Sequence, residues 1–169
     1  LGNETERLST VLESTEVDNV LLYWTGHGTD KSFTLLETGE KFTDVQFGET
    51  VRKMYENKKY QSMLVCAEPC YSGSVVKAIE GTPLVLGFSA ASEDESSYAD
   101  NYSSELGVWM CDRFTYNLIR LYKGQNYINL LDVYKMLNAS TIGSNVKVYN
   151  YDYYYDLADV MLWDYFYDF

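Results

Sequence analysis

Basic residues and long apolar runs are scarce in this sequence, and each shortage argues against a class of function. Lys and Arg number 13 against 25 Asp and Glu, which gives a formal charge of −12. A protein that binds nucleic acid presents a basic face to the phosphates, so this charge argues against a nucleic-acid partner. No apolar run reaches the roughly 18 residues that a membrane-spanning helix needs. We therefore expect no membrane segment in this chain.

Cysteine and histidine are also few. The three cysteines, an odd number, argue against a disulfide framework. One histidine and three scattered cysteines offer no zinc-ligand spacing, so we expect no metal and no cofactor. We interpret Cys66 and Cys111 as core residues. The composition, 46% hydrophobic and 22% charged over 169 residues, is typical of one globular domain with a sizeable core.

One apolar run ends abruptly next to a cysteine. Residues Met63 to Cys66 have the length and type of a strand buried on both faces. Pro69 cannot donate to a sheet ladder, so the strand should end near Glu68 and leave Cys70 on the following loop. In an open α/β sheet, sites form at the carboxyl ends of the strands, where a nucleophile would be useful. The alternative is a structural thiol, because free cysteine is among the most buried residue types.

The only histidine follows a second strand of the same kind. Residues Val20 to Trp24 lead into Thr-Gly-His-Gly, in which glycines on both sides of His27 let the backbone approach a ligand closely. If the two strands are parallel neighbours, His27 and Cys70 emerge at the same sheet edge. An imidazole there lowers the pKa of the thiol and protonates the leaving amine. The alternative for a lone histidine is a surface or hydrogen-bonded core residue.

These residues lie in longer stretches that resemble a known family. Residues 23–28, Tyr-Trp-Thr-Gly-His-Gly, and residues 68–74, Glu-Pro-Cys-Tyr-Ser-Gly-Ser, are similar to the two catalytic motifs of the legumain family of caspase-like cysteine peptidases. Residues 95–99 and 106–109 resemble the loop and helix start that build the legumain specificity pocket. The likeness covers nearly the whole chain, with the motifs in the same order.

Other residues are closer to the catalytic subunit of the GPI-anchor transamidase, a member of the same family. These are Gly26 to Gly28, Arg113 to Thr115 and the closing stretch Trp163 to Phe166. The resemblance implies an α/β fold, a three-layer α/β/α caspase-like domain with a mostly parallel central sheet. The alternation of strand and helix patterns along the chain favours the same class.

The resemblance also assigns roles to residues. It makes Cys70 the nucleophile, His27 the base, and the amides of Gly28 and Cys70 the oxyanion hole. The residues that it places in the S1 pocket are Glu68, Ser96, Ser97 and Val108. Glu68 is alternatively a salt-bridged surface acid.

Specificity and reaction type have several interpretations. A carboxylate with hydroxyls can hold the carboxamide of asparagine, which favours an endopeptidase that cuts peptide or protein substrates after asparagine. Val108 stands where legumain has a second acid and Gly26 where it has an aspartate, so an arginine-specific peptidase and a transamidase-like enzyme are alternatives. A catalytically inactive interaction domain is the third.

The beginning of the chain carries a further expectation. In legumain-like folds about a third of the catalytic domain precedes the histidine strand, whereas only 18 residues precede Asn19 here. We therefore interpret residues 1–169 as the carboxyl-terminal part of a single caspase-like domain, produced by processing before Leu1. The missing strands would come from an associated amino-terminal fragment, since Asn19 to Trp24 would otherwise present an unpaired edge. The resemblance implies an extracytoplasmic location, whether secreted, in the cell envelope or lysosome-like.

The remaining elements follow from periodicity and capping signals. Ser89 to Glu105 is predicted to be a long loop, and Tyr149 to Tyr155 a half-buried hairpin or packing surface, with ligand stacking as the alternative. The other expected strands are 32–36 and 82–88. The expected helices are 4–15, 44–57, 75–79, 107–121 and 129–137.

Overall fold

A four-stranded sheet forms the centre of the molecule in the computed structural model, which describes residues 12–35, 38–124 and 127–166. The strand order is β1-β5-β6-β9, and their bounds are Asn19–Trp24, Ser62–Ala67, Val85–Ser89 and Lys147–Tyr149. The first three strands are parallel, and β9 is antiparallel to β6. The predicted mixed α/β class with a mostly parallel sheet is confirmed.

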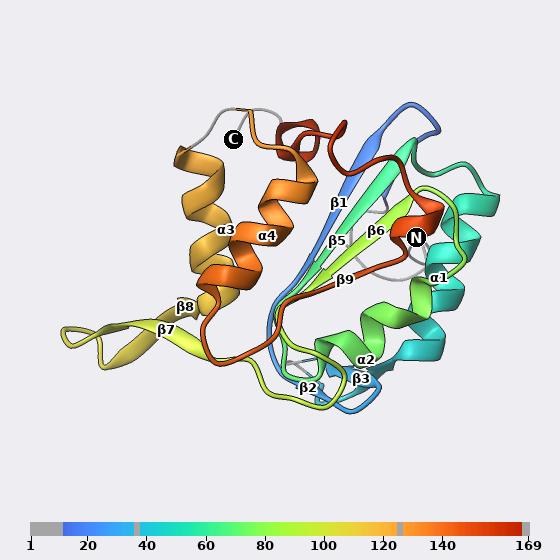
Figure 1. Ribbon diagram of the computed structural model, residues 1–169. Helices are drawn as coiled ribbons and strands as arrows, with labels where there is room; N and C mark the ends of the chain where they lie inside the picture. The colour runs from blue at the N-terminus through green and yellow to red at the C-terminus, as the bar shows by residue number, and fades with distance from the viewer. Residues whose placement is uncertain (1–11, 36–37, 125–126, 167–169) are drawn as a thin grey trace.

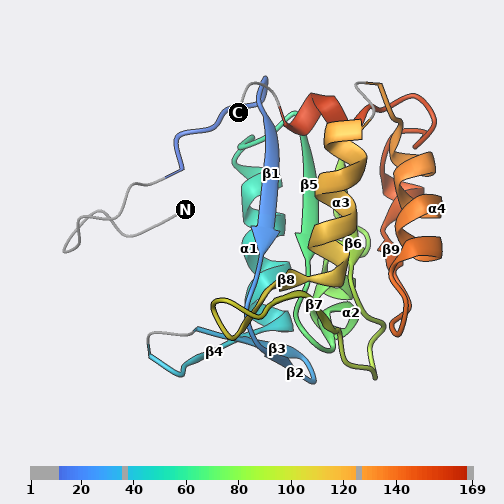
Figure 2. The ribbon, with the colours of Figure 1, turned by 90° about the vertical axis from the view of Figure 1, so that its left-hand side faces the viewer.

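Helices cover both faces of this sheet (Figures 1 and 2). On one face lie α1 (Asp44–Glu56), α2 (Ser72–Val76) and the 3-10 turn η1 (Lys77–Ile79). On the other lie α3 (Arg113–Gly124) and α4 (Leu130–Ser140). Because both faces are covered, all six residues of β5 are buried.

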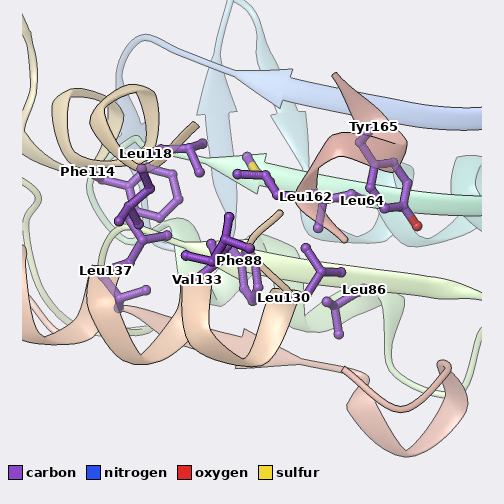
Figure 3. Packing of buried hydrophobic residues seen from close by; sticks show 14 of the residues in the cluster. Leu64, Leu86, Phe88, Phe114, Leu118, Leu130, Val133, Leu137, Leu162 and Tyr165 are labelled. Atoms are coloured by element: carbon purple, nitrogen blue, oxygen red, sulfur yellow. The ribbon is translucent and has the colours of Figure 1, made fainter. Parts of the chain in front are cut away.

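Two apolar cores hold these layers together. Under α3 and α4, the side chains of Phe88, Phe114, Val133 and Leu137 pack closely (Figure 3). Under α1 and α2, Met63 belongs to the second core. Burial of large apolar side chains is the main stabilising contribution to such a domain.

The start of α1 shows how a local signal fixes an element. Thr43 accepts a hydrogen bond from the backbone N–H of Gln46, and the Gln46 side chain accepts one from the Thr43 N–H. This reciprocal capping box satisfies two N–H groups that the helix itself cannot pair. The predicted helix 44–57 is confirmed to within one residue.

A small second sheet follows the histidine loop. It contains β2 (Gly28–Thr29), β3 (Ser32–Thr34) and β4 (Lys41–Thr43), all antiparallel. Trp24, the last residue of β1, stacks on Phe33 at 4.9 Å and on Phe42 at 5.5 Å between ring centroids. These stacked rings fix the direction in which the chain leaves the main sheet.

Residues 89–112 differ most from expectation. The predicted loop contains β7 (Ala99–Ser103), and the predicted helix 107–121 begins only at Arg113. The intervening β8 (Val108–Asp112) pairs with β7 in a hairpin. Gly107 takes a φ of +68° in its turn, a conformation that glycine adopts without steric cost. Met110, which shares the helical period of Phe114 and Leu118, lies on β8 instead and is 52% exposed.

The two ends of the chain depart from prediction in smaller ways. The expected helix 4–15 lies mostly outside the described residues, and residues 12–15 are not helical. The tyrosine-rich stretch is not a hairpin, and Tyr151–Tyr153 form the 3-10 turn η2. It is a packing surface in part, because Tyr149 is buried in one core and Tyr154 packs against the other. A last 3-10 turn, η3, spans Leu162–Tyr165.

Two structural tests bear on membranes and metals. Over the described residues, no helix combines the length and apolar character needed to cross a bilayer. The same part of the chain contains no group of three or more His, Cys, Asp or Glu side chains arranged to hold a metal ion.

Candidate active site

The histidine and cysteine loops leave the sheet side by side. Strands β1 and β5 are parallel and in register, so that Trp24, the last residue of β1, pairs with Ala67, the last of β5. The Glu68 N–H still donates to the Trp24 carbonyl at 3.0 Å. His27 and Cys70 are therefore each three residues beyond a matched pair of strand ends. Both lie at the carboxyl edge of the sheet, where α/β proteins build their sites.

Gly28 is the point at which the two loops touch. A Cβ atom at this position would lie 2.2 Å from the Cys70 carbonyl oxygen and 2.8 Å from Pro69 Cβ. Only a residue without a side chain allows so close an approach. A backbone hydrogen bond also holds the histidine loop, because the His27 carbonyl accepts from the Thr34 N–H at 2.9 Å. The sequence thus fixes the separation of the His27 and Cys70 backbones.

Cys70 sits at the apex of a sharp turn from β5 into α2. Tyr71 adopts a left-handed φ of +57°, which is uncommon for a non-glycine residue and typical of functional turns. Hydrogen bonds from Tyr71 N–H to Glu95 carbonyl (2.8 Å) and from Gly73 N–H to Ala91 carbonyl (3.1 Å) tie this turn to the next loop. The thiol is only partly buried.

Ser97 is the side chain that contacts the Cys70 sulfur. The thiol donates to the Ser97 carbonyl at 3.7 Å, and its Sγ lies 3.8 Å from Ser97 Oγ. No hydrogen bond joins Cys70 to His27 within the described residues, although the two line the same pocket. Such contacts in resting enzymes are often long and tighten only when substrate binds.

A pocket of about 480 Å³ unites these residues. Of the predicted site residues, His27, Cys70, Glu68 and Ser97 line it, whereas Ser96 and Val108 do not. Val108 is 50% exposed on β8. The full lining is Thr25, Gly26, His27, Glu68, Cys70, Ser97, Ala99, Trp109, Met110, Cys111 and Asp112.

Glu68 is held by three hydroxyl groups, from β1, from the loop that follows it and from α3. Thr25 donates to its Oε1, and Thr115 and Tyr23 donate to its Oε2, the last at 3.2 Å. The residue is 8% exposed and forms no ion pair in the described structure, so it is not a salt-bridged surface acid. Burial is the main reason that the pKa of the Tyr23 phenol lies well above its usual value, and the nearby Glu68 charge raises it further.

Comparison with known proteins bears directly on this arrangement. The model of the peptidase C13 family matches residues 1–158. The chain belongs to the peptidase C13 family. Its similarity to individual members is modest. It is 38% identical over 98 residues to a putative GPI-anchor transamidase of Caenorhabditis elegans, covering 58% of this chain and 30% of that protein.

Two further relatives are a legumain and a vacuolar-processing enzyme. Mouse legumain is 35% identical over 107 residues, which are 63% of this chain and 24% of that protein. The vacuolar-processing enzyme delta-isozyme of Arabidopsis thaliana is 32% identical over 126 residues, which are 68% of this chain and 27% of that protein. The chain thus spans between about a quarter and a third of the length of these relatives.

The three cysteines of this C13 chain occupy different environments. Cys66 is in the core as predicted, and burial raises its pKa to about 12. Cys111 is not a core residue: it is only partly buried and lines the pocket. Burial and the charges of Asp100, Asp112 and Glu68 raise the pKa of Cys111, which disfavours its nucleophilic thiolate.

Asp112 is the main pocket residue that sequence reasoning missed. It ends β8, and its Oδ1 accepts the Phe114 N–H at 2.8 Å, as the side chain of a helix N-cap does. Burial and the Glu68 charge raise the pKa of Asp112 to about 6, although the hydrogen bond from Phe114 opposes this shift. An aspartate directly before the Arg-Phe-Thr helix start is a capping signal, and it could have placed the strand-to-helix boundary at residue 112.

Proposed function

We propose that this C13 chain carries the catalytic dyad of a cysteine endopeptidase. The Cys70 thiolate attacks the substrate carbonyl carbon, and the peptide C–N bond breaks to leave a thioester. His27 takes the thiol proton and passes it to the leaving amine. Water, deprotonated by His27, then hydrolyses the thioester. The close packing of Gly28 on the Cys70 carbonyl carries this proposal, because it brings both catalytic loops to one pocket.

The developing oxyanion needs preorganised donors. We assign these to the backbone N–H groups of Gly28 and Cys70, which belong to the two loops in contact. One such donor typically contributes roughly 3 kcal/mol to transition-state stabilisation. Because backbone amides cannot be removed by substitution, their contribution is best tested through the spacing of the loops.

We further propose that the enzyme cuts after asparagine. The pocket beside Cys70 contains carboxylates and the Ser97 hydroxyl, and no Lys or Arg lines it among the described residues. A carboxamide both donates and accepts, so it matches a mixed lining of acceptors and hydroxyls. Ser96 and Val108 remain predicted S1 residues.

The dyad is tested by mutation and labelling together. Cys70→Ala should abolish turnover and covalent capture by a peptide electrophile, and His27→Ala should leave a folded protein with little activity. Peptide mapping of the captured protein should find the label on Cys70. Labelling of Cys66 or Cys111 instead, or wild-type activity of His27→Ala, would contradict the assigned roles. A catalytically inactive domain would show neither capture nor turnover.

Substrate panels test the specificity. Fluorogenic peptides that differ only at P1 should be cleaved after asparagine. Strong cleavage after arginine with none after asparagine would instead support the arginine-specific alternative.

Transamidase-like acyl transfer is the second candidate. Val108 on β8 and the 38% identity to the Caenorhabditis elegans transamidase favour it. In this reaction the Cys70 thioester is released to an amine rather than to water. Added hydroxylamine would then yield a peptide hydroxamate in preference to the acid, which mass spectrometry distinguishes.

We also propose that the chain is completed by an amino-terminal segment of a caspase-like domain. The outer edge of β1 has no strand partner within the described residues, and none of its six residues is fully buried. An unpaired apolar edge favours strand addition. Hydrogen exchange of the natural protein should show the β1 backbone N–H groups protected by such a strand, and rapid exchange along the whole outer edge of β1 would contradict the proposal. An extracytoplasmic location is part of the same proposal, and fractionation of cells tests it.

A further inference from the structure

The two acids that line the pocket differ in how much of their acceptor capacity the protein already uses. An ionised carboxylate offers about four acceptor positions. Glu68 uses three of them on the hydroxyls of Thr25, Thr115 and Tyr23, and it is 8% exposed. Its main partners are thus within the protein. Glu68 is better placed to hold β1, β5 and α3 together than to receive a substrate group.

Asp112 retains more capacity and lies closer to solvent. Its Oδ1 accepts the Phe114 N–H at 2.8 Å, and the Ser97 side chain also hydrogen-bonds to it. Two contacts leave about half of the acceptor positions unused. The residue is only partly buried and lines the pocket from the end of β8. A substrate side chain can therefore reach an unsatisfied oxygen.

The nearby cation does not remove this negative charge. Arg113 is adjacent in sequence, but its Nε pairs with Asp100 at 2.9 Å and its Nη1 donates to the Ile142 carbonyl. The pKa of Asp112 lies near 6 because burial and the Glu68 charge outweigh the hydrogen bonds and Arg113. The carboxylate is ionised at neutral pH and repels an anionic group in the same pocket.

We propose that Asp112 is the specificity-determining residue of this pocket, accepting an N–H from the carboxamide of a P1 asparagine and excluding a P1 aspartate. This inference rests on the proposed peptidase function and deepens it. It shifts substrate recognition from Glu68, whose oxygens the protein occupies, to an acid at the end of the β7–β8 hairpin.

Matched substrates give the test. We would measure kcat/KM at pH 7.5 for two peptides identical except for Asn or Asp at P1, with the full-length protein. Asp112→Asn keeps the helix cap and removes the charge. We expect the Asn-to-Asp preference to fall at least tenfold, through slower cleavage after Asn and faster cleavage after Asp. A preference within twofold of the wild type would overturn the proposal.

Control variants separate charge in the pocket from charge elsewhere on the hairpin and from damage to the fold. Glu105→Gln removes one negative charge from the exposed hairpin turn and should leave the preference unchanged. Asp112→Ser also caps a helix and lacks the charge, so it should behave as Asp112→Asn does. Asp112→Glu restores a carboxylate and should recover part of the preference. Melting temperatures identify any variant that fails to fold. If Asp112→Asn does not fold, the substrate preference of Asp112→Ser tests the proposal in its place.

Labelling distinguishes a failure of this inference from a failure of the proposed function. A small electrophile such as iodoacetamide reports on Cys70 without using the P1 pocket. Suppose that the wild-type protein is labelled at Cys70 and cleaves after Asn, and that the Asp112→Asn variant keeps the wild-type Asn-to-Asp preference. Only the role of Asp112 is then contradicted. Wild-type protein that cleaves neither substrate contradicts both. Faster cleavage after Arg than after Asn overturns the carboxamide assignment.

Discussion

Gly28→Ala should disable the protein by moving two loops apart. The added Cβ would meet the Cys70 carbonyl oxygen at 2.2 Å and Pro69 Cβ at 2.8 Å. Relief of these contacts requires a separation of roughly 1 Å, since non-bonded heavy atoms normally lie about 3.5 Å apart. Overpacking of this kind costs about 1–3 kcal/mol. The loss of unfolded-state entropy in a Gly→Ala change offsets only about 0.4–1 kcal/mol, so the net effect is destabilising.

The effect on catalysis should exceed the effect on stability. A misplacement of about 1 Å between catalytic groups can lower the rate on the order of 100-fold. For a domain of this size each kcal/mol lowers Tm by about 2–4 °C, so the variant should remain folded at room temperature. We would measure Tm by circular dichroism, kcat/KM with a P1 Asn peptide, and the rate of Cys70 alkylation.

Gly124→Ala is the matched control for this variant. Gly124 ends α3, and a Cβ there would meet no atom within 4 Å. It should retain wild-type activity and a Tm equal to or slightly above that of the wild type. If Gly28→Ala behaved in the same way, the loops would not be packed as described, and the argument for a shared catalytic pocket would lose its main support.

Three other predictions concern stability. Thr43→Ala removes the α1 cap and should cost about 1 kcal/mol in urea denaturation. Asn150→Ala removes a buried side chain that makes three backbone hydrogen bonds at a φ of +70°, and it should cost about 3 kcal/mol or more by the same assay. Burial first, and then Glu68, raise the pKa of Asp112 to about 6, so between pH 3.8 and 6 the native protein holds a proton that the unfolded chain releases. The free energy of unfolding should therefore fall by up to about 3 kcal/mol as the pH rises through this window. If the difference in unfolding free energy between wild type and Asp112→Asn did not change with pH, the prediction would be wrong.

The parts of the fold that the sequence predicts well are those determined locally. The β5 strand is a short apolar run that stops at a proline, and α1 begins at a capping box whose two members are three residues apart. The position of Cys70 after a strand end follows from the same local rules. Its proximity to His27 needed one further assumption, that β1 and β5 are parallel neighbours, and this assumption is correct.

The surroundings of Glu68 could not be predicted in this way. Three hydroxyls converge on its carboxylate from Tyr23 on β1, Thr25 just beyond it, and Thr115 on α3. These residues are 43 to 47 positions away from Glu68 in the chain. No local pattern reports such a convergence, because it depends on how α3 packs against the sheet. Glu68 does line the pocket that contains Cys70, its place in S1 stays a prediction, and its three hydroxyl partners were not foreseen.

The hairpin shows how one wrong element changes the interpretation of a site. Met110, Phe114, Leu118 and Leu121 match a helical period, and the last three are indeed buried on α3. Residues before Arg113 pair with β7 instead, since Val and Trp suit a strand and Asp112 caps the helix. The strand carries Trp109 to Asp112 along the pocket wall. The pocket beside Cys70 therefore has a wall of exposed strand whose last residue is an acid, and under the proposed function we expect the P1 preference to follow Asp112 rather than Glu68.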